Sequence, residues 1–226
     1  MFSFVGLELL FGSSTQYILA EDTRRTKRLL QAIASIWSSM SYDSTLFGQR
    51  THAAGSNDYE LTTRNGFVID AKSAIRKLKS FHEHNATQKQ SSVISDIQDG
   101  MNVVLVSDAG TPLISDPGTE LVRACVQWGV QVVPVPGPSA PLAALVGSGI
   151  QAVPYTFIGF LPTHGSARRK RISTFRDIPS TLIIFVPPHD LQSTLSDLEL
   201  ELGPTRCLCI ARYEILRNII QNVNKS

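Results

Sequence analysis

Apolar runs alternate along the chain with segments whose apolar positions recur at helical spacing. The clearest strand is the β-branched and aliphatic run 103–106, which is typical of a buried parallel strand and stops at Ser-Asp-Ala-Gly-Thr-Pro. We expect Asp116 to cap the helix that follows, with Pro117 at its first position. The apolar face of that helix is predicted to comprise Leu121, Val122, Cys125, Val126 and Trp128.

The same design repeats in the next segment. After Gly129, which is expected to end the helix, residues 130–135 are predicted to form a second strand. A Gly/Pro-rich loop and a short Ala/Leu helix at 142–146 follow. Two successive strand–loop–helix units indicate a βαβ arrangement. Open α/β sheets bind ligands at the carboxyl ends of their strands, so both loops are candidate ligand loops.

Hydrophobic periodicity divides the chain into two predicted α/β domains, 1–150 and 151–226. In the first, we expect a strand at 15–20, a helix capped by Asp22 or Thr23, a poorly ordered insertion at about 38–70, a weak element near 71–81 and a helix at 88–98. The apolar stripe of the first helix is predicted to be Leu29, Leu30, Ile33, Ile36 and Trp37. In the second, we expect strands at 155–160, 181–186 and 206–211 and helices at 167–175 and 190–200.

Composition narrows the class of protein. The 226 residues are 42% hydrophobic, enough for a core, and the formal net charge is only +2. The three cysteines form neither a disulfide framework nor a metal-binding spacing, which favours a reducing compartment. No apolar run reaches the length of a membrane span, and we expect no signal peptide.

Two basic runs stand out against this nearly neutral background, one at residues 24–28 and one at residues 168–171. Each run by itself suits a solvated helix face. Two such runs beside candidate ligand loops favour contact with an RNA backbone. The predicted RNA-binding residues are Arg24, Arg25, Arg168, Arg169 and Lys170.

Five motifs carry a family resemblance. They are VSDAGTPLISDPG (106–118), VPVPGPSA (133–140), AEDTRRTKRLL (20–30), SFHEHNATQKQ (80–90) and TFIGFLP (156–162). With them the chain resembles the tetrapyrrole (corrin/porphyrin) methylase superfamily. It is more narrowly similar to the ribosomal RNA small subunit methyltransferase I family.

The resemblance implies a two-domain α/β fold, with a mainly parallel sheet in the N-terminal domain and a smaller mixed α/β domain after it. It also implies methyl transfer from S-adenosyl-L-methionine to a ribose 2′-hydroxyl of a cytidine in small-subunit ribosomal RNA. The partner would be the ribosomal RNA or small ribosomal subunit, with no membrane and with a homodimer as an option. The expected location is the cytoplasm for a bacterial source and a chloroplast or mitochondrion for a eukaryotic one.

The resemblance and the loop chemistry together predict the cofactor site. Gly110 and Gly137 allow close backbone approach, while Asp108, Thr111 and Ser139 offer polar groups. Ser139 could instead be a helix N-cap, and Asp108 could close an Asx turn. The predicted cofactor-binding residues are Asp108, Ala109, Gly110, Thr111, Ile114, Gly137, Ser139 and Ala140.

The catalytic candidates are Glu21, Asp22 and His84. Glu21 and Asp22 follow a strand, where one of them could orient or deprotonate a ribose hydroxyl while Arg24 grips a phosphate. The alternative for Asp22 is a plain helix cap. His84 belongs to a His-x-His sequence without an evident third ligand, so we expect no metal and assign it RNA contact or proton transfer.

Two alternative functions stay open. A small-molecule methylase acting on a tetrapyrrole-like acceptor would use the same cofactor loops, although EDTRRT and FHEHN favour the RNA branch. The family begins with a Pro-Thr-Pro-Ile-Gly-Asn type loop, whereas residues 1–12 here contain no proline, and residues 30–77 contain additional sequence. A catalytically impaired variant, with a truncated C-terminal domain, is the second alternative.

Overall fold

The computed structural model describes residues 9–12, 14–39, 50–52, 59–61, 70–214 and 217–222. The chain divides into two units, Met1–Pro138 and Ser139–Ser226. The helix that begins at Ala140 therefore belongs to the second unit, although the sequence pattern placed it in the first. The predictions about residues 1–8, and most of those about the insertion at 38–70, lie outside the described residues.

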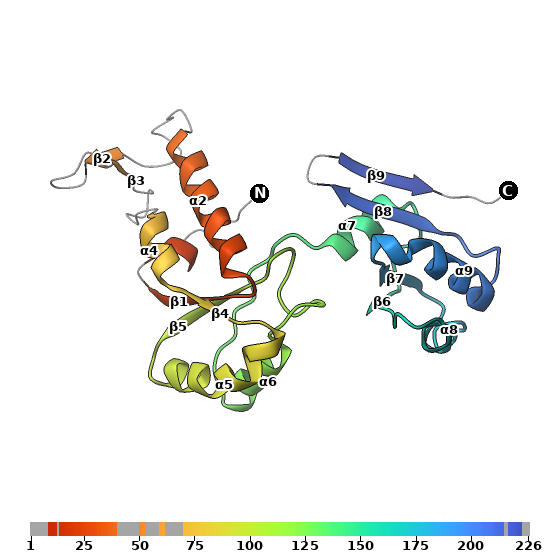
Figure 1. Cartoon of the computed structure of the whole chain (residues 1–226), viewed down its shortest axis with the longest axis horizontal. Helices are drawn as coiled ribbons and strands as arrows, with labels where there is room; N and C mark the ends of the chain where they lie inside the picture. The colour runs from red at the N-terminus through yellow and green to blue at the C-terminus, as the bar shows by residue number, and fades with distance from the viewer. Residues whose placement is uncertain are drawn as a thin grey trace. The chain divides into compact units, whose positions relative to one another are not determined.

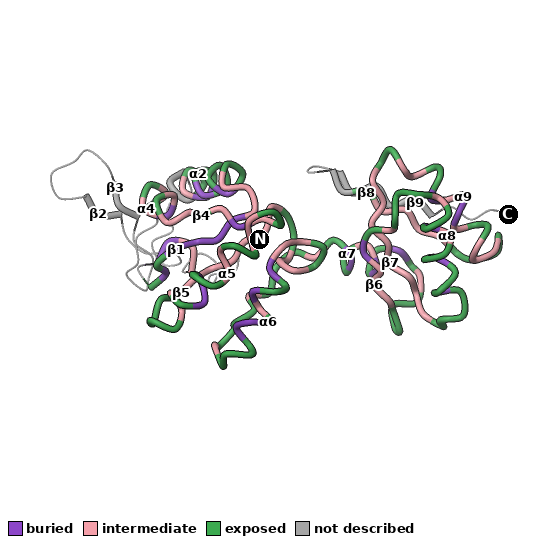
Figure 2. The backbone as a smooth tube through the Cα atoms, turned by 60° about the horizontal axis from the view of Figure 1, so that its bottom comes forward, coloured by how far each residue is buried: buried purple, intermediate pink, exposed green. Residues whose placement is uncertain are grey.

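A three-stranded parallel sheet forms the centre of the first unit, in the order β4-β1-β5 (Figure 1). Its strands are β1 (Thr15–Ala20), β4 (Leu78–Ser80) and β5 (Asn102–Val106). The central strand β1 runs through the buried interior, as Figure 2 shows. The predicted strand at 15–20 is confirmed, and the predicted parallel sheet is present.

Helices cover both faces of this sheet because alternate β1 side chains point to opposite sides. Tyr17 and Leu19 pack with helices α5 (Glu83–Gln98) and α6 (Thr119–Gln127) in one apolar cluster. A second cluster holds Leu30 and Ile33 of α2 (Thr23–Ser39) together with Ala74 of α4 (Ala71–Arg76). The stripe predicted on α2 is correct at Leu30 and Ile33, whereas Leu29 and Ile36 are exposed and the Trp37 side chain is outside the described part.

Two predictions in the 103–135 region are wrong. Residues 130–135 form no strand; Val132 and Val133 are exposed. Pro134 removes an N–H within this run, and Pro136 and Pro138 remove the next two on the same edge, which disfavours pairing in a sheet. Helix α6 begins at Thr119 after Gly118, whose φ is 125°, and not at Pro117.

The core face of α6 also differs from its prediction. Leu121, Ala124 and Cys125 are buried, whereas Val126 and Trp128 are about two-thirds exposed. The remaining described strands of this unit, β2 (Arg50–His52) and β3 (Tyr59–Leu61), pair antiparallel within the predicted insertion.

The second unit contains a parallel strand pair and an antiparallel one. Strands β6 (Tyr155–Phe160) and β7 (Thr181–Phe185) pair parallel, and β8 (Cys209–Glu214) pairs antiparallel with β9 (Arg217–Asn222). The helices are α7 (Ala140–Gly147), α8 (Gly165–Ser173), the 3-10 turn η1 (Pro188–Asp190) and α9 (Leu191–Leu202). This mixed α/β arrangement confirms the fold class predicted for the C-terminal part.

Candidate functional site

The candidate site lies where the three parallel strands of the first unit end. Ser80, Ala20 and Val106 stand in register at the carboxyl ends of β4, β1 and β5. Two residues beyond these ends, the chain places His82, Asp22 and Asp108 respectively. The chain passes from β1 to β4 on one side and then to β5 on the other, so the strand order reverses between β1 and β5. Such a switch point is where open α/β sheets bind ligands.

The side chain of Asp22 binds Arg24 in the first turn of helix α2. Its Oδ1 accepts hydrogen bonds from the backbone N–H of Arg24 at 2.8 Å and from Arg24 Nε at 3.0 Å, and its Oδ2 accepts one from Nη2 at 2.9 Å. The side-chain hydrogen bonds from Arg24, followed by the backbone one, lower the pKa of Asp22 to about 2. A carboxylate this weakly basic is a poor proton acceptor. The hydrogen bond from the Arg24 N–H has the geometry of a helix cap, the alternative role that the sequence allows for Asp22.

Asp108 joins the end of β1 to the end of β5. Its Oδ1 accepts a 3.0 Å hydrogen bond from the backbone N–H of Asp22, and its Oδ2 lies 3.4 Å from Arg25 Nη1. Its own backbone N–H lies 3.5 Å from Oε2 of Glu21. The Asp108 side chain is 18% exposed, so it is shielded but within reach of solvent.

Glu21 has a perturbed carboxyl group at the end of β1. Burial raises its pKa, and the negative charges of Asp108 and Asp116 act in the same direction. The backbone N–H of Asp108 and the charge of Arg25 oppose the rise without cancelling it. Burial likewise raises the pKa of Asp116. A hydrogen bond from Ser107 opposes this rise, and the charge of Asp108 adds to it. Carboxyl groups perturbed in this way are typical of functional sites.

The loop that joins β5 to α6 has an unusual backbone. Positive φ angles occur at Gly110 (84°), at Gly118 (125°) and at two residues with side chains, Leu113 (72°) and Ser115 (64°). Left-handed backbone at non-glycine residues is costly and is concentrated at functional sites. Within this loop Ala109, Gly110 and Ile114 are exposed.

A hydrogen bond ties this loop to the second predicted cofactor loop. The hydroxyl of Thr111 donates to the carbonyl oxygen of Pro138 at 3.0 Å. Gly137 is exposed beside that contact. A Cβ atom on Gly110 would lie 3.8 Å from the same carbonyl, which is an ordinary contact, so its positive φ is what favours glycine.

His84 is exposed in the first turn of α5, and its ring lies edge-on to that of His82, with ring centroids 5.9 Å apart. His82 itself joins a hydrogen-bonded network. Asn85 Nδ2 lies 3.0 Å from His82 Nε2 and donates to Ser80 Oγ at 3.2 Å. Lys89 donates to the same oxygen at 2.9 Å. His82, the first histidine of the His-x-His sequence, and Asn85, neither of which was assigned to the predicted site, therefore organise the end of β4. Their position two and five residues after a strand end was the signal available.

The basic run of the second unit does not lie wholly on the surface. Arg168 is buried, and its Nε donates to Asp197 of α9 at 2.6 Å. Arg169 reaches the other oxygen of Asp197 at 3.2 Å and stays half-exposed. Lys170 is exposed. Arg168 therefore joins α8 to α9, and we remove it from the predicted RNA surface.

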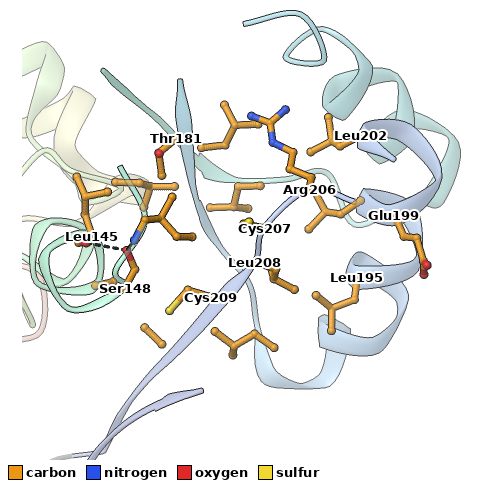
Figure 3. A pocket seen from close by; sticks show the side chains of 18 of the residues that line it. Leu145, Ser148, Thr181, Leu195, Glu199, Leu202, Arg206, Cys207, Leu208 and Cys209 are labelled. Atoms are coloured by element: carbon orange, nitrogen blue, oxygen red, sulfur yellow. Dashed lines mark hydrogen bonds between the residues drawn. The ribbon is translucent and has the colours of Figure 1, made fainter. Parts of the chain in front are cut away.

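The predicted residues Ser139 and Ala140 belong to the second unit, at the beginning of α7. Ser139 occupies the N-cap position without a side-chain capping hydrogen bond. Ala140 lines a mostly apolar cavity of about 660 Å³ among α7, β7, α9 and residues 204–211. Figure 3 shows side chains such as Leu145, Leu195 and Cys209 around this space.

The described residues contain no group of three or more His, Cys, Asp or Glu side chains that could hold a metal ion. No helix in the same part of the chain has the length and apolar character needed to cross a membrane.

Comparison with known proteins places the chain in a family. Residues 16–213 match the family Tetrapyrrole (Corrin/Porphyrin) Methylases, and the chain belongs to that family. It is 42% identical over 145 residues to the Ribosomal RNA small subunit methyltransferase I of Mesorhizobium japonicum, covering 64% of this chain and 49% of the relative. The proteins of that name from Escherichia coli O157:H7 and Halalkalibacterium halodurans are 39% and 36% identical, over 68% and 82% of this chain and 54% and 51% of their own lengths. The chain thus spans about half the length of the curated relatives it matches.

Proposed function

We propose that the chain is an S-adenosylmethionine-dependent methyltransferase that acts on a cytidine ribose 2′-hydroxyl in small-subunit ribosomal RNA. The observation that carries the proposal is the meeting of Glu21, Asp22 and Asp108 at the switch point between β1 and β5. The relatives are ribosomal RNA small subunit methyltransferases by name, which supports the RNA substrate.

The residues at this site suit the methyl donor. S-adenosylmethionine carries an ammonium group, ribose hydroxyls and a sulfonium, for which the shielded carboxylate of Asp108 is a complementary partner. Ala109, Gly110 and Ile114 offer exposed backbone and apolar surface beside it. Asp108 and the loop at 109–114 would hold the donor, which supplies an electrophilic methyl group when bound. The site thus combines a negatively charged side chain with backbone that a ligand can approach closely.

Glu21 then acts as the general base. Its raised pKa makes its carboxylate more basic than an ordinary one, and it accepts the proton of the ribose hydroxyl. Asp22 has the structural task of starting α2 and holding Asp108 through its N–H. Methyl transfer is an in-line displacement, so the remaining contribution of the protein is to align the reacting atoms.

RNA backbone contacts are assigned to the exposed cations. Arg24 and Arg25 are 85% and 66% exposed at the start of α2, next to the proposed base. In the second unit, Arg169 and Lys170 offer further positive charge. Contacts of this kind position a nucleic acid without reading its sequence.

Nucleoside mass spectrometry of ribosomal RNA tests the proposal. Cells lacking the gene should lose 2′-O-methylcytidine at one small-subunit position, and the wild-type gene should restore it. Glu21→Gln should fail to restore it, whereas Glu120→Gln, on the exposed face of α6, should succeed. Unchanged ribose methylation after deletion would refute the RNA function.

The cavity of the second unit favours one alternative, a methyltransferase for a small tetrapyrrole-like acceptor. Its volume of about 660 Å³ and its mostly apolar lining fall within the usual range of small-molecule sites. Fluorescence quenching by a porphyrin, compared between the wild type and Leu195→Arg, tests this alternative. Tight binding that the substitution abolishes, together with unmodified RNA, would replace the first proposal.

A further inference from the structure

Arg25, which is proposed to contact RNA, also contacts a carboxylate of the protein itself. Its guanidinium Nη1 lies 3.4 Å from Oδ2 of Asp108, a residue far away in the sequence. The Arg25 side chain is 66% exposed, whereas that of Asp108 is only 18% exposed. One end of the guanidinium therefore faces a shielded carboxylate, and most of the side chain faces solvent.

The two oxygens of Asp108 have separate partners. Oδ1 is held by the backbone N–H of Asp22 at 3.0 Å, and Oδ2 is the atom nearest Arg25. If Arg25 swings toward solvent, Asp108 stays in place because the backbone donor remains. The carboxylate then lacks its neutralising partner at Oδ2.

Arg24 differs from Arg25 in this respect. Its Nε and Nη2 bind Asp22 within the same turn, and both contacts belong to the start of α2. Arg25 instead connects α2 to the loop after β5. Of these two neighbouring cations, Arg25 is the one that links the basic surface to the candidate cofactor loop.

We propose that Arg25 is a positioning residue shared between Asp108 and an RNA phosphate, so that RNA binding and binding of the cationic methyl donor strengthen one another. The inference rests on the proposed function. A phosphate attracts guanidinium with charge-assisted, often bidentate hydrogen bonds, and it competes with Asp108 for Arg25. The released Asp108 carboxylate then attracts the sulfonium and ammonium of the donor more strongly.

The electrostatics of Glu21 agree with this coupling. The charge of Arg25 opposes the rise of the Glu21 pKa, while burial, Asp108 and Asp116 raise it. Withdrawal of Arg25 toward a phosphate therefore raises the pKa of Glu21 further. The proposed base would become more basic when RNA is present.

Calorimetry on the full chain tests the coupling. S-adenosylmethionine is titrated with and without a short, uniformly 2′-O-methylated oligoribonucleotide, which keeps the phosphates but has no acceptor hydroxyl. For the wild type we expect the oligonucleotide to tighten donor binding about 5-fold or more, the usual lower range of such couplings. S-adenosylhomocysteine, whose sulfur is neutral, should show a smaller effect.

Arg25→Gln should bind the donor more tightly than the wild type without RNA, and the oligonucleotide should add no further gain. Arg25→Lys, which keeps the charge, should retain part of the coupling and serves as a second variant if the glutamine protein does not fold. The matched control is Arg123→Ala, since Arg123 is 60% exposed and pairs with Glu120 at 2.8 Å outside the site. It should behave like the wild type.

A carboxyl ¹³C NMR titration gives a readout independent of the donor. Arg25→Gln should raise the pKa of Glu21, and Arg123→Ala should leave it unchanged. Two results would overturn this inference but not the proposed function. One is that RNA leaves donor binding by the wild type unchanged, and the other is that Arg25→Gln keeps the full coupling. Absence of donor binding by the wild type would overturn the proposed function as well.

Discussion

The backbone N–H of Asp22 donates a 3.0 Å hydrogen bond to the carboxylate of Asp108. This bond joins the residue that starts helix α2 to the loop that follows β5, across the point where the strand order reverses. It keeps Glu21, the neighbour of Asp22, next to Asp108, whose backbone N–H lies 3.5 Å from Glu21 Oε2. The site therefore depends on contacts between segments that are distant in the sequence.

Removing the Asp108 carboxylate should weaken both the fold and donor binding. Asp108→Ala leaves the Asp22 N–H without its acceptor, and we expect the free energy of unfolding to fall by about 1–3 kcal/mol in urea titrations. Asp108→Asn keeps an oxygen for that N–H, so its stability should stay near that of the wild type. Equal losses for the two variants would show that the hydrogen bond contributes little.

Glu21→Gln should slow methyl transfer by about 10²–10⁴-fold, the usual contribution of a general base. Only the ionised carboxylate accepts a proton, so the wild-type rate should rise with pH through the Glu21 pKa, which lies above the ordinary 4.5. The glutamine variant should lose that limb of the pH–rate profile. A profile that keeps the limb would assign the base to another residue.

Glu21 should also affect stability, in the opposite direction. A carboxyl group whose folded-state pKa is raised stabilises the fold at low pH, and this contribution is lost as pH rises through that pKa. Glu21→Gln should therefore have a higher Tm than the wild type at pH 7, and the difference should disappear below the ordinary glutamate pKa. Thermal unfolding at several pH values measures it, with Glu120→Gln as an exposed control.

Breaking the buried pair Arg168–Asp197 should destabilise the second unit. Burial acts to raise the pKa of Asp197, but the hydrogen bonds and charges of Arg168 and Arg169 together hold it below 3.8. Removing one member of a buried pair leaves the other as an unpaired buried charge. Arg168→Ala should therefore lower the free energy of unfolding by roughly 3–5 kcal/mol. Lys170→Ala should change stability by less than about 0.5 kcal/mol.

The pH dependence of that pair follows from the same shift. Because the folded-state pKa of Asp197 is lowered, its stabilisation is complete above the ordinary value of 3.8 and is lost as the pH falls below it. Asp197→Asn should remove this acid-sensitive part of the unfolding curve. An identical acid limb in the variant would assign that limb to other carboxylates.

A side chain at Gly118 should destabilise the fold. A Cβ atom there would lie 2.6 Å from Leu105 Cδ2, in addition to the strain of φ 125°. Gly129 also has a positive φ, 70°, but nothing lies within 4 Å of its Cβ position. Gly118→Ala should therefore lower the urea midpoint more than Gly129→Ala, and equal effects would mean that only backbone strain matters.

Local patterns predicted much of the fold. The strands at 15–20 and 155–160 have the predicted bounds, because each is a short apolar run with clear limits. The strand expected at 130–135 failed, since its apolar pattern ignored the N–H groups that the prolines remove. Helix α6 began later than expected because backbone conformation at Gly118, rather than a good capping residue, decided its start.

The sequence by itself determined the parallel α/β class, the family motifs and the region of the candidate site, because strand runs and strand-end loops are local signals. Only the tertiary structure showed that the pKa of Glu21 is raised and that of Asp22 lowered, and that Arg168 is buried, unlike its neighbours. The physical reason is that burial and charge environment depend on groups distant in the sequence. Asp108 next to Glu21 and Asp197 beside Arg168 are contacts that no run of adjacent residues specifies.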